Sequence, residues 1–537
     1  MEFNLADLFE DVADAVPERE AIVCGNRRLT FAQLDERATR LAHWLRAQGL
    51  GKGDHIGLYL YNGSEYMEAS LAAYKIRAVP ININYRYVEE ELRYLFDNAD
   101  LAGVIHHREF APRIAAIASD LPKLRTFLAV EDGSDADCST IGSSDYEEAI
   151  AASPSTRDFP PRSADDLYIL YTGGTTGMPK GVMWRHEDLF FAALSGGNPY
   201  GAPPERPEQV AENAKSSADV TSFPVAPLMH GAAQWAAMIF LYAGGKTILA
   251  PGKRFDPAQV WRLVEDEKVQ ALSIVGDAIG RPLAEALDES YDTSSLMVIG
   301  SGGATFSDAV KEQLRAKLPN TILLDTFGGS EGGNQGHGVE RDPGAQGPRF
   351  QGHDHTAVLD EHHRPIAPGS GIAGMLARRG HIPLGYYKDP EKTAKTFLDI
   401  DGTRWVIPGD MAIIEADGAI TLLGRGSQCI NSGGEKVFPE EVEAALRKHP
   451  AVFDAVVVGL PDERWGERVA AVVQLRDGQA LTLEDVDAHA RQHIAGYKVP
   501  RLLCVVDEMM RQPSGKADYR WAKEQALSAE QAVGETA

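Results

Sequence analysis

The sequence has few cysteines, no excess of basic residues and no long apolar run, and each absence excludes a class of protein. Its cysteines are Cys24, Cys138, Cys429 and Cys504, which form neither a disulfide framework nor a metal-binding spacing and so predict a reducing compartment. Lys and Arg number 53 against 78 Asp and Glu, and a net charge of −25 argues against a nucleic-acid partner. The longest apolar stretch, residues 232–243, is shorter than the ~20 residues that span a bilayer.

The start of the chain and its length indicate where the protein works and how it is divided. Residues 1–7 lack the basic start and apolar core of a secretion signal, so we expect a cytoplasmic protein. A chain of 537 residues, 44% hydrophobic and 24% charged, has the composition of a globular protein and is too long for one simple core. We therefore expect at least two domains.

Helical and strand patterns alternate over residues 5–160. Apolar residues at helical spacing predict a helix over 31–48, the run 54–60 predicts a strand, and residues 64–75 predict the next helix. This alternation implies a parallel sheet that helices cover on both faces. Residues 131–163 are rich in Asp, Ser and Pro and predict a surface loop.

After about residue 423 the pattern changes to that of a small α+β unit. Its predicted elements are a helix over 439–448, strands over 456–459 and 469–475, a helix over 483–494 and a strand over 502–506. The fold class is therefore α/β, with a large N-terminal domain of parallel-rich sheets layered with helices (residues 1–423) and a small C-terminal α+β domain (residues 424–537).

Residues 171–181, YTGGTTGMPKG, form the most unusual stretch of the chain, and they follow an apolar run that predicts a buried strand. Glycines and threonines after a strand present backbone N–H groups and hydroxyls without bulky side chains, which suits a polyphosphate, and Lys180 adds a positive charge. A Walker loop needs Ser or Thr directly after its lysine, whereas Gly181 and Val182 follow here, so this is a different phosphate loop.

This stretch resembles the phosphate loop of the adenylate-forming superfamily, which contains acyl-CoA synthetases, luciferases and the adenylation domains of peptide synthetases. Gly173 stands where that family usually has serine. The resemblance continues in order from about residue 5 to residue 521, and residues 79–100 and 172–189 are most similar to ligases of sterol side-chain acids. It implies a synthetase that forms an acyl-adenylate from ATP with release of pyrophosphate and then transfers the acyl group to CoA. Mg²⁺ is the implied metal.

The resemblance also implies which residues bind the nucleotide. They are Thr172, Gly173, Gly174, Thr175, Thr176, Gly177, Lys180, Gly302, Gly303, Ala304, Asp325, Thr326, Phe327, Gly328, Ser330, Asp410, Arg425 and Lys516. In this set Phe327 stacks near adenine, Ser330 replaces the usual threonine near the α-phosphate, and Asp410 accepts hydrogen bonds from both ribose hydroxyls. Pro408 stands where the family usually has threonine, and Lys516 is the closing lysine.

Catalysis and acid binding are implied for an overlapping set. The catalytic residues would be Thr172, His230, Glu331 and Lys516, with Glu331 and Thr172 holding Mg²⁺. The acid would lie against His230, Gly231, Trp235, Gly276, Gly302 and Gly328. The small residues Gly231, Ala232, Gly276 and Gly302 predict a roomy pocket. Trp235 would gate or floor an acyl tunnel, or simply pack in the core. The segment near His230 lacks the aspartate that pairs an amino group, which argues against an amino-acid substrate.

The C-terminal motifs resemble the joint and the CoA site of the family. CoA would contact Ser432, Gly433, Gly434, Glu435, Trp465, Tyr497 and Arg501, although a surface aromatic without a ligand remains an alternative at each aromatic position. The hinge would lie near residues 425–428 with Ser427 at its centre, where Asp or Lys is usual. Residues 385–394 also resemble the family, and we expect them to be structural rather than catalytic.

Three other functions stay open: a long-chain fatty acid–CoA ligase, a ligase that loads a carrier protein, and a non-catalytic nucleotide-binding homologue. The last is allowed by the departures at Gly173, Pro408 and Ser427. It is disfavoured because the chain keeps Lys180, Glu331, Asp410, Arg425 and Lys516 together. The expected partners are a small carboxylic acid, ATP and CoA, with a homodimer as a further possibility.

Overall fold

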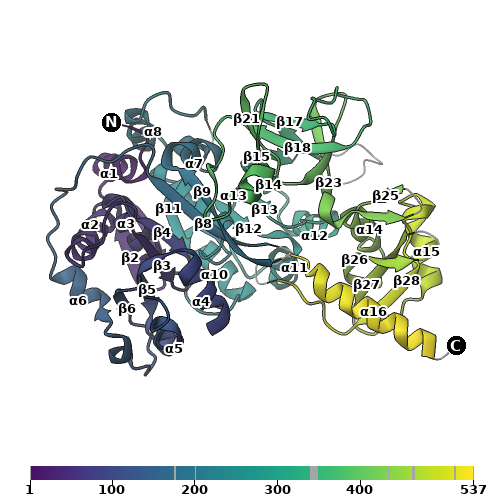
Figure 1. The fold of residues 1–537 in the computed structure, drawn as a ribbon, viewed down its shortest axis with the longest axis horizontal. Helices are drawn as coiled ribbons and strands as arrows, with labels where there is room; N and C mark the ends of the chain where they lie inside the picture. Colours follow the sequence, from purple (N-terminus) through teal and green to yellow (C-terminus); the bar gives the residue numbers. More distant parts are fainter. Residues whose placement is uncertain are drawn as a thin grey trace.

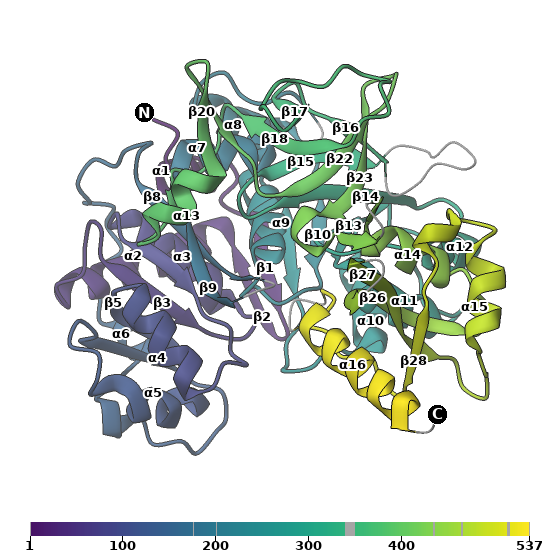
Figure 2. The same ribbon diagram turned by 45° about the vertical axis from the view of Figure 1, so that its right-hand side comes forward.

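The computed structural model describes residues 2–174, 177–199, 201–338, 349–432, 435–462, 466–512 and 516–535. Figure 1 shows most of the chain in one large body, and the C-terminal residues, drawn in yellow, in a smaller body beside it. In both views helices α11 (Gly276–Ala286) and α12 (Asp308–Lys317) belong to the side of the large body that faces the small one (Figures 1 and 2). No helix among the described residues combines the length and the apolar character required to cross a membrane.

Two sheets form the large body. In the described residues the first has eight strands, in the order β19 (Gly385–Tyr386), β9 (Gly177–Arg185), β8 (Leu167–Gly174), β4 (Val79–Asn82), β3 (His55–Tyr59), β5 (Leu101–His107), β6 (Thr126–Val130) and β7 (Ser144–Asp145). Strands β8, β4, β3, β5, β6 and β7 are parallel neighbours, while β9 returns antiparallel to β8 as the second arm of a hairpin. The phosphate stretch lies at the tip of this hairpin.

The second sheet has fifteen strands in the described residues. Their order is β2 (Arg27–Thr30), β1 (Glu20–Cys24), β11 (Lys246–Leu249), β10 (Thr221–Pro224), β12 (Ala271–Ile274), β13 (Val298–Gly302), β14 (Ile322–Gly329), β15 (Gly333–Gly338), β16 (Arg349–Gly352), β23 (Ala419–Arg425), β22 (Asp410–Ile414), β18 (Gly374–Arg379), β21 (Thr403–Val406) and β20 (Phe397–Ile400), with β17 (Thr356–Leu359) beside β18. Strands β1, β11, β10, β12, β13 and β14 run parallel to one another, whereas β2 is antiparallel to β1 and the strands after β14 pair antiparallel.

Apolar residues that alternate along the strands bury both faces of each sheet. Ile56 and Leu58 pack inward in the core between the sheets, together with helices α1 (Leu5–Ala15), α2 (Phe31–Ala47), α3 (Ser64–Lys75), α7 (His186–Ala192) and α9 (Gly231–Tyr242). Tyr59 packs on the opposite face, against α4 (Glu89–Asn98) and α5 (Ala111–Ala118). The other face of the large sheet is covered by α10 (Pro257–Glu267), α11 and α12. The result is five layers, as expected for parallel sheets.

The small body is a sheet with helices on both faces. Its described strands are β25 (Glu435–Val437), β24 (Ile430–Ser432), β27 (Gly466–Leu475), β26 (Val452–Asp462) and β28 (Leu502–Val506). Val457 and Ala471 pack against α14 (Pro439–Leu446) and α15 (Leu483–Ala490), whereas Val456 and Val472 pack toward α16 (Tyr519–Glu535). The chain reaches this sheet from β23 through a short 3-10 turn, η4 (Gly426–Gln428).

The fold class predicted from the sequence is confirmed, because both bodies have the expected mixture of sheets and helices. The predicted helix over 64–75 is α3, and the predicted strand over 502–506 is β28. The prediction of a surface loop over 131–163 is wrong in part, because residues 146–151 form helix α6 (Tyr146–Ala151). Asp145 caps this helix, and Tyr146 and Ile150 are buried against the neighbouring core.

His186, the first residue of α7, is a buried histidine that makes stability depend on pH. Its Nδ1 accepts hydrogen bonds from the backbone N–H of Leu5, at 3.3 Å, and from the Asn4 amide, at 3.1 Å. Burial lowers the pKa of His186 from 6.5 to about 4, although Asp166 acts in the opposite direction. Between these two values the unfolded chain binds more protons than the folded one, so stability is complete above pH 6.5 and falls as the pH drops toward 4.

We expect replacement of His186 by glutamine to remove this pH dependence. The difference in unfolding free energy between the original chain and His186→Gln should change by up to about 1.4 kcal/mol per pH unit between pH 6.5 and 4. Urea unfolding followed by circular dichroism at pH 7 and pH 5 measures it. His362→Gln, at an exposed histidine, is the control and should leave the slope unchanged. If the unfolding free energy of both variants changed equally with pH, His186 would not be the source of the pH dependence.

Candidate active site at the carboxyl ends of the parallel strands

The sequence motifs converge because most of them follow the carboxyl ends of parallel strands. In the large sheet, His230 follows β10, Gly276 follows β12, residues 302–304 end and follow β13, and residues 325–331 end and follow β14. In the other sheet, β8 is parallel to β4 and ends in the phosphate stretch. Ligands of open α/β sheets bind at this edge, so these residues form the candidate site.

The phosphate hairpin places Thr172 and Lys180 directly opposite each other across β8 and β9. Opposite residues of an antiparallel pair project to the same face, so the hydroxyl and the ammonium lie on one side of the hairpin. The Lys180 Nζ donates to Asp389 Oδ2 at 2.6 Å. This contact and the backbone N–H of Lys392 hold the pKa of Asp389 below its usual value. The predicted binding residues Thr175 and Thr176 lie outside the described residues.

A buried asparagine that the sequence did not single out joins the phosphate hairpin to the histidine segment. The Asn82 Nδ2 donates to the carbonyl oxygens of Tyr171 and Met229, each at 2.8 Å, while its Oδ1 accepts from the Tyr171 N–H at 2.8 Å. Thr172 and His230 are the next residues after these two partners. Asn82 therefore fixes the relative position of two candidate functional groups from the end of β4.

Trp235 is held from one side by a chain of buried polar groups. Its Nε1 donates to the Tyr168 hydroxyl at 3.2 Å, and that hydroxyl donates to the Gln234 Oε1 at 2.9 Å. Burial raises the pKa of Tyr168, so the phenol stays neutral and can donate. Trp235 is half-buried and packs against the core between the sheets, as the core-packing alternative expects, and its role at an acyl tunnel stays a prediction.

The glycines at the predicted acid positions are closely packed, and the roomy acid pocket stays a prediction. A Cβ on Gly276 would lie 2.5 Å from the Thr305 carbonyl oxygen, and one on Gly302 would lie 2.5 Å from the Thr326 Oγ1. At Gly231 and Gly328 a Cβ would overlap Leu170 and the Gly333 carbonyl in the same way. These glycines permit close packing at the strand ends, and Gly276, with φ +55°, also adopts a backbone that favours glycine.

Glu331 is a buried carboxylate at the end of β14, and two hydroxyls orient it. The Ser330 Oγ donates to Glu331 Oε2 at 2.6 Å, and the Tyr386 hydroxyl donates to Glu331 Oε1 at 2.9 Å. The Trp184 Nε1 donates to the Ser330 carbonyl at 3.0 Å and ties this turn to β9. One oriented carboxylate fits Mg²⁺, which usually takes one or two carboxylates and completes its shell with phosphate oxygens and water.

The remaining nucleotide residues lie farther along the large sheet. Phe327 packs against a cluster that includes Ala412, two residues after Asp410, and its ring centroid is 5.4 Å from that of Phe350. Asp410 stands opposite Arg425 in the register of β22 and β23. Asp325 forms an ion pair with Lys311 of α12, and the Thr326 Oγ1 donates to the Ser301 carbonyl at 3.0 Å, so these two side chains stabilise the strand ends.

The predicted CoA and closing residues belong to the small body. Ser432 ends β24, and Tyr497 is 40% exposed. Arg501 and Lys516 are also exposed. The first turn of α16, which follows Lys516 closely, lies near the phosphate hairpin in both views (Figures 1 and 2). The predicted residues Gly433, Gly434 and Trp465, together with the side chains of Arg425, Ser427 and Glu435, lie outside the described residues.

Comparison with known families identifies this arrangement. The family model of the AMP-binding enzymes matches residues 9–387, and the model of their C-terminal domain matches residues 441–516. The chain belongs to the AMP-binding enzyme family. The resemblance to adenylate-forming synthetases that the motifs predict is thereby confirmed.

Two relatives cover almost the whole of this AMP-binding enzyme. It is 50% identical over 536 residues to a 3-oxocholest-4-en-26-oate–CoA ligase of Rhodococcus rhodochrous, covering 98% of this chain and 96% of that one. It is also 50% identical over 532 residues to a medium/long-chain fatty acid–CoA and 3-oxocholest-4-en-26-oate–CoA ligase of Mycobacterium marinum, covering 97% and 96%.

Solved structures share the fold over the full length. The anthranilate CoA ligase AuaEII in complex with anthranoyl-AMP has a TM-score of 0.84 at 22% identity and covers 99% of this chain and 98% of its own. ATP-bound MatB from Rhodopseudomonas palustris has a TM-score of 0.82 at 26% identity, whereas apo MatB has 0.73, each covering 98% of this chain and 99% of its own. This AMP-binding enzyme is thus arranged more like the ATP-bound than the apo form.

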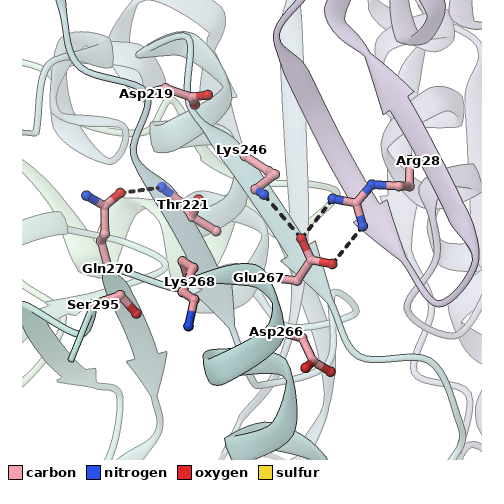
Figure 3. A pocket seen from close by; sticks show the side chains of 9 residues that line it. All are labelled: Arg28, Asp219, Thr221, Lys246, Asp266, Glu267, Lys268, Gln270 and Ser295. Atoms are coloured by element: carbon pink, nitrogen blue, oxygen red, sulfur yellow. Dashed lines mark hydrogen bonds and ion pairs between the residues drawn. The ribbon is translucent and has the colours of Figure 1, made fainter. Parts of the chain in front are cut away.

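A cavity of about 530 Å³ in this AMP-binding enzyme lies away from these motifs (Figure 3). It opens at the amino ends of β10, β11 and β12, where Thr221, Lys246 and Gln270 lie, which is the edge opposite to the candidate site. In its wall Glu267 bonds both Arg28 and Lys246. None of the described motif residues lines this cavity, so the candidate site is placed at the other edge.

Proposed function

We propose that the chain is an AMP-forming acyl-CoA synthetase that activates the side-chain carboxylate of a steroid acid. The observation that carries the proposal is 50% identity, over 98% of the chain, to a ligase of 3-oxocholest-4-en-26-oate. A long-chain fatty acid is the second candidate substrate, because the Mycobacterium marinum relative is named for both classes. The candidate site supports the shared chemistry, since a hydroxyl and a lysine of one sheet and a histidine and an oriented carboxylate of the other follow the carboxyl ends of parallel strands or lie beside them.

In the first half-reaction the acid carboxylate attacks the α-phosphorus of ATP and pyrophosphate leaves. The carboxylate is already ionised, so the protein supplies position and charge rather than proton transfer. Thr172 and Lys180 bind the leaving phosphates, Asp410 the ribose, and His230 the reacting carboxylate. Bound Mg²⁺, held by Glu331 and Thr172, would neutralise phosphate charge.

In the second half-reaction the CoA thiol attacks the acyl carbonyl and AMP leaves. Domains of residues 1–423 and 424–537, with the hinge at Ser427 within residues 425–428, remain part of the proposal. The change from the large sheet, whose strand β23 ends at Arg425, to the small sheet, whose strand β24 begins at Ile430, supports a hinge in this region. The small domain would remove Lys516 and bring residues 432–435 to the site, with Trp465, Tyr497 and Arg501 against CoA. The closer fit to ATP-bound MatB supports an adenylation arrangement here.

We expect pyrophosphate release to be fastest with a steroid side-chain acid. A panel of acetate, octanoate, palmitate, benzoate and a steroid side-chain acid, each with and without CoA, measures kcat/KM for each. The steroid acid should exceed palmitate by at least about tenfold, because differences of several methylene groups in an apolar pocket are worth a few kcal/mol. CoA should stimulate turnover, since it removes the acyl-adenylate.

Other results from this panel would favour one of the alternative functions. A peak at palmitate would favour the fatty acid ligase, and turnover that needs a protein-bound thiol instead of CoA would favour a carrier-protein ligase. ATP binding without pyrophosphate release on the whole panel would favour a non-catalytic homologue. The homodimer and the cytoplasmic location stay predictions, which light scattering and cell fractionation test.

A further inference from the structure

The segment 385–393, which we expected to be structural, runs beside the candidate site. Its strand β19 pairs with β9, with Gly385 opposite Met183 and Tyr386 opposite Val182. The Tyr387 N–H donates to the Gly181 carbonyl at 2.8 Å, so pairing continues to the residue after Lys180. The segment is thus attached along the strand that leaves the phosphate hairpin.

One side chain of this segment reaches the proposed metal ligand. The Tyr386 hydroxyl donates to Glu331 Oε1 at 2.9 Å, while the Ser330 hydroxyl holds Oε2. Both Tyr386 and Glu331 are buried. Two hydroxyls, one on each carboxylate oxygen, therefore fix the orientation of the Glu331 side chain. Without the Tyr386 hydroxyl, Oε1 would lose one of the donors that fix this orientation.

Tyr386 is itself held in place from several sides. The Lys392 Nζ lies 4.2 Å from the centroid of its ring, and the Phe397 ring meets it edge-on at 5.8 Å. Its backbone N–H donates to the Thr393 Oγ1 at 2.9 Å. Gly385, with φ +146°, permits this close approach, because a Cβ there would lie 2.5 Å from the Thr393 Cγ2. The ring is therefore a rigid support for its hydroxyl.

The same segment also holds the lysine of the phosphate hairpin. Asp389 caps α13 (Pro390–Thr396) by accepting the Lys392 N–H at 2.9 Å through Oδ1, and its Oδ2 accepts from the Lys180 Nζ at 2.6 Å. Because the Asp389 carboxylate caps the helix, its side chain is held in one orientation, and this orientation determines where the Lys180 ammonium lies. The segment 385–393 thus positions both Lys180, proposed to bind the phosphates, and Glu331, proposed to bind their Mg²⁺.

We propose that Tyr386 is a positioning residue for the adenylation half-reaction, holding the Glu331 carboxylate in the orientation that binds the Mg²⁺ of the bound nucleotide. This inference rests on the proposed function, because that function gives Glu331 its role. Tyr386 touches neither the nucleotide nor the acid in this proposal and acts only through Glu331.

The test compares Tyr386→Phe with Tyr387→Phe, a matched loss of one hydroxyl that bonds Asp100 at 2.8 Å instead. Calorimetric titration with α,β-methylene-ATP measures nucleotide affinity with Mg²⁺ and with EDTA, and does not need turnover. We expect Tyr386→Phe to weaken the Mg²⁺ complex about tenfold, as for loss of one hydrogen bond to a charged group, and to leave the affinity in EDTA within about twofold. Tyr387→Phe should match the original chain in both conditions.

A second variant shows whether Tyr386 acts through Glu331. In a Glu331→Gln background, Tyr386→Phe should cause no further loss of Mg²⁺-dependent affinity, because the charge it positions is absent. Equal behaviour of the two tyrosine variants, or a loss of the same size in EDTA and in the Glu331→Gln background, would overturn the inference. A Mg²⁺-specific loss in a chain that activates no acid would instead refute the proposed function, while the positioning of Glu331 by Tyr386 for Mg²⁺ and nucleotide would still be supported.

Discussion

Replacing Lys516 by alanine is expected to slow formation of the acyl-adenylate by about 10²–10³-fold, the usual effect of removing one preorganised charge from a transition state. Thioester formation from a supplied acyl-adenylate should stay within about twofold, because in our proposal the small domain has withdrawn Lys516 by then. Pyrophosphate release with acid and ATP measures the first rate. Appearance of acyl-CoA from synthetic acyl-adenylate measures the second.

The loop that carries Lys516 is attached to the small sheet, as the proposed domain alternation requires. The loop that presents it is closed by a bridge between Arg511 and Ala517, and by a hydrogen bond of 2.9 Å from the Gln512 N–H to the Lys516 carbonyl. Arg511 binds Asp454 at the start of β26 through contacts of 2.6–2.8 Å. The loop is thus anchored to the small sheet and must move with it.

Lys523→Ala, on the exposed side of the adjoining helix, is the matched control and should leave both rates unchanged. Equal losses in both half-reactions for Lys516→Ala would contradict domain alternation about Ser427. No loss in either would place the closing charge on another residue and would also weaken the assignment of this loop to the family motif.

The sequence predicted best those features that local pattern determines. Helix α3 was expected over residues 64–75, and the structure has the same bounds. The phosphate stretch was found by its unusual glycine-rich composition, and the other motifs by their resemblance to the family. Their convergence follows from topology, since the carboxyl ends of β10, β12, β13 and β14 must share one edge once the strands are parallel.

The partners of the site residues could not be predicted, because they are distant in the sequence. Asn82 meets Met229 across 147 positions, Trp184 meets Ser330 across 146, and Tyr386 meets Glu331 across 55. Asn82, Trp184 and Tyr386 lie at or near the ends of strands, and only tertiary packing shows their roles. The segment 385–393 was therefore expected to be structural, although it contacts both Glu331 and Lys180.

Replacing Lys75 by methionine is expected to destabilise the large domain by about 3–5 kcal/mol, as when one partner of a buried ion pair is removed. Lys75 is 1% exposed at the end of α3, and its Nζ lies 2.5 Å from Glu10 Oε1 and 2.7 Å from Asp35 Oδ1. Burial alone would raise the pKa of Glu10, but Lys75 and Arg162 together lower it. The variant keeps the length of the side chain and removes its charge, so two buried carboxylates lose a shared cation.

The midpoint of urea unfolding, followed by circular dichroism, measures this loss. Lys395→Met removes an exposed lysine that pairs with Glu391 and should cost less than about 1 kcal/mol. Because Lys75 favours ionised Glu10, the penalty of Lys75→Met should be larger at pH 7 than near pH 4.5, where the carboxyl can take up a proton. Adding Glu10→Gln to Lys75→Met should restore part of the stability, since it removes the uncompensated charge. A loss no larger than that of Lys395→Met would mean that Arg157 and Arg162, which bond Asp35 and Glu10, already neutralise this cluster.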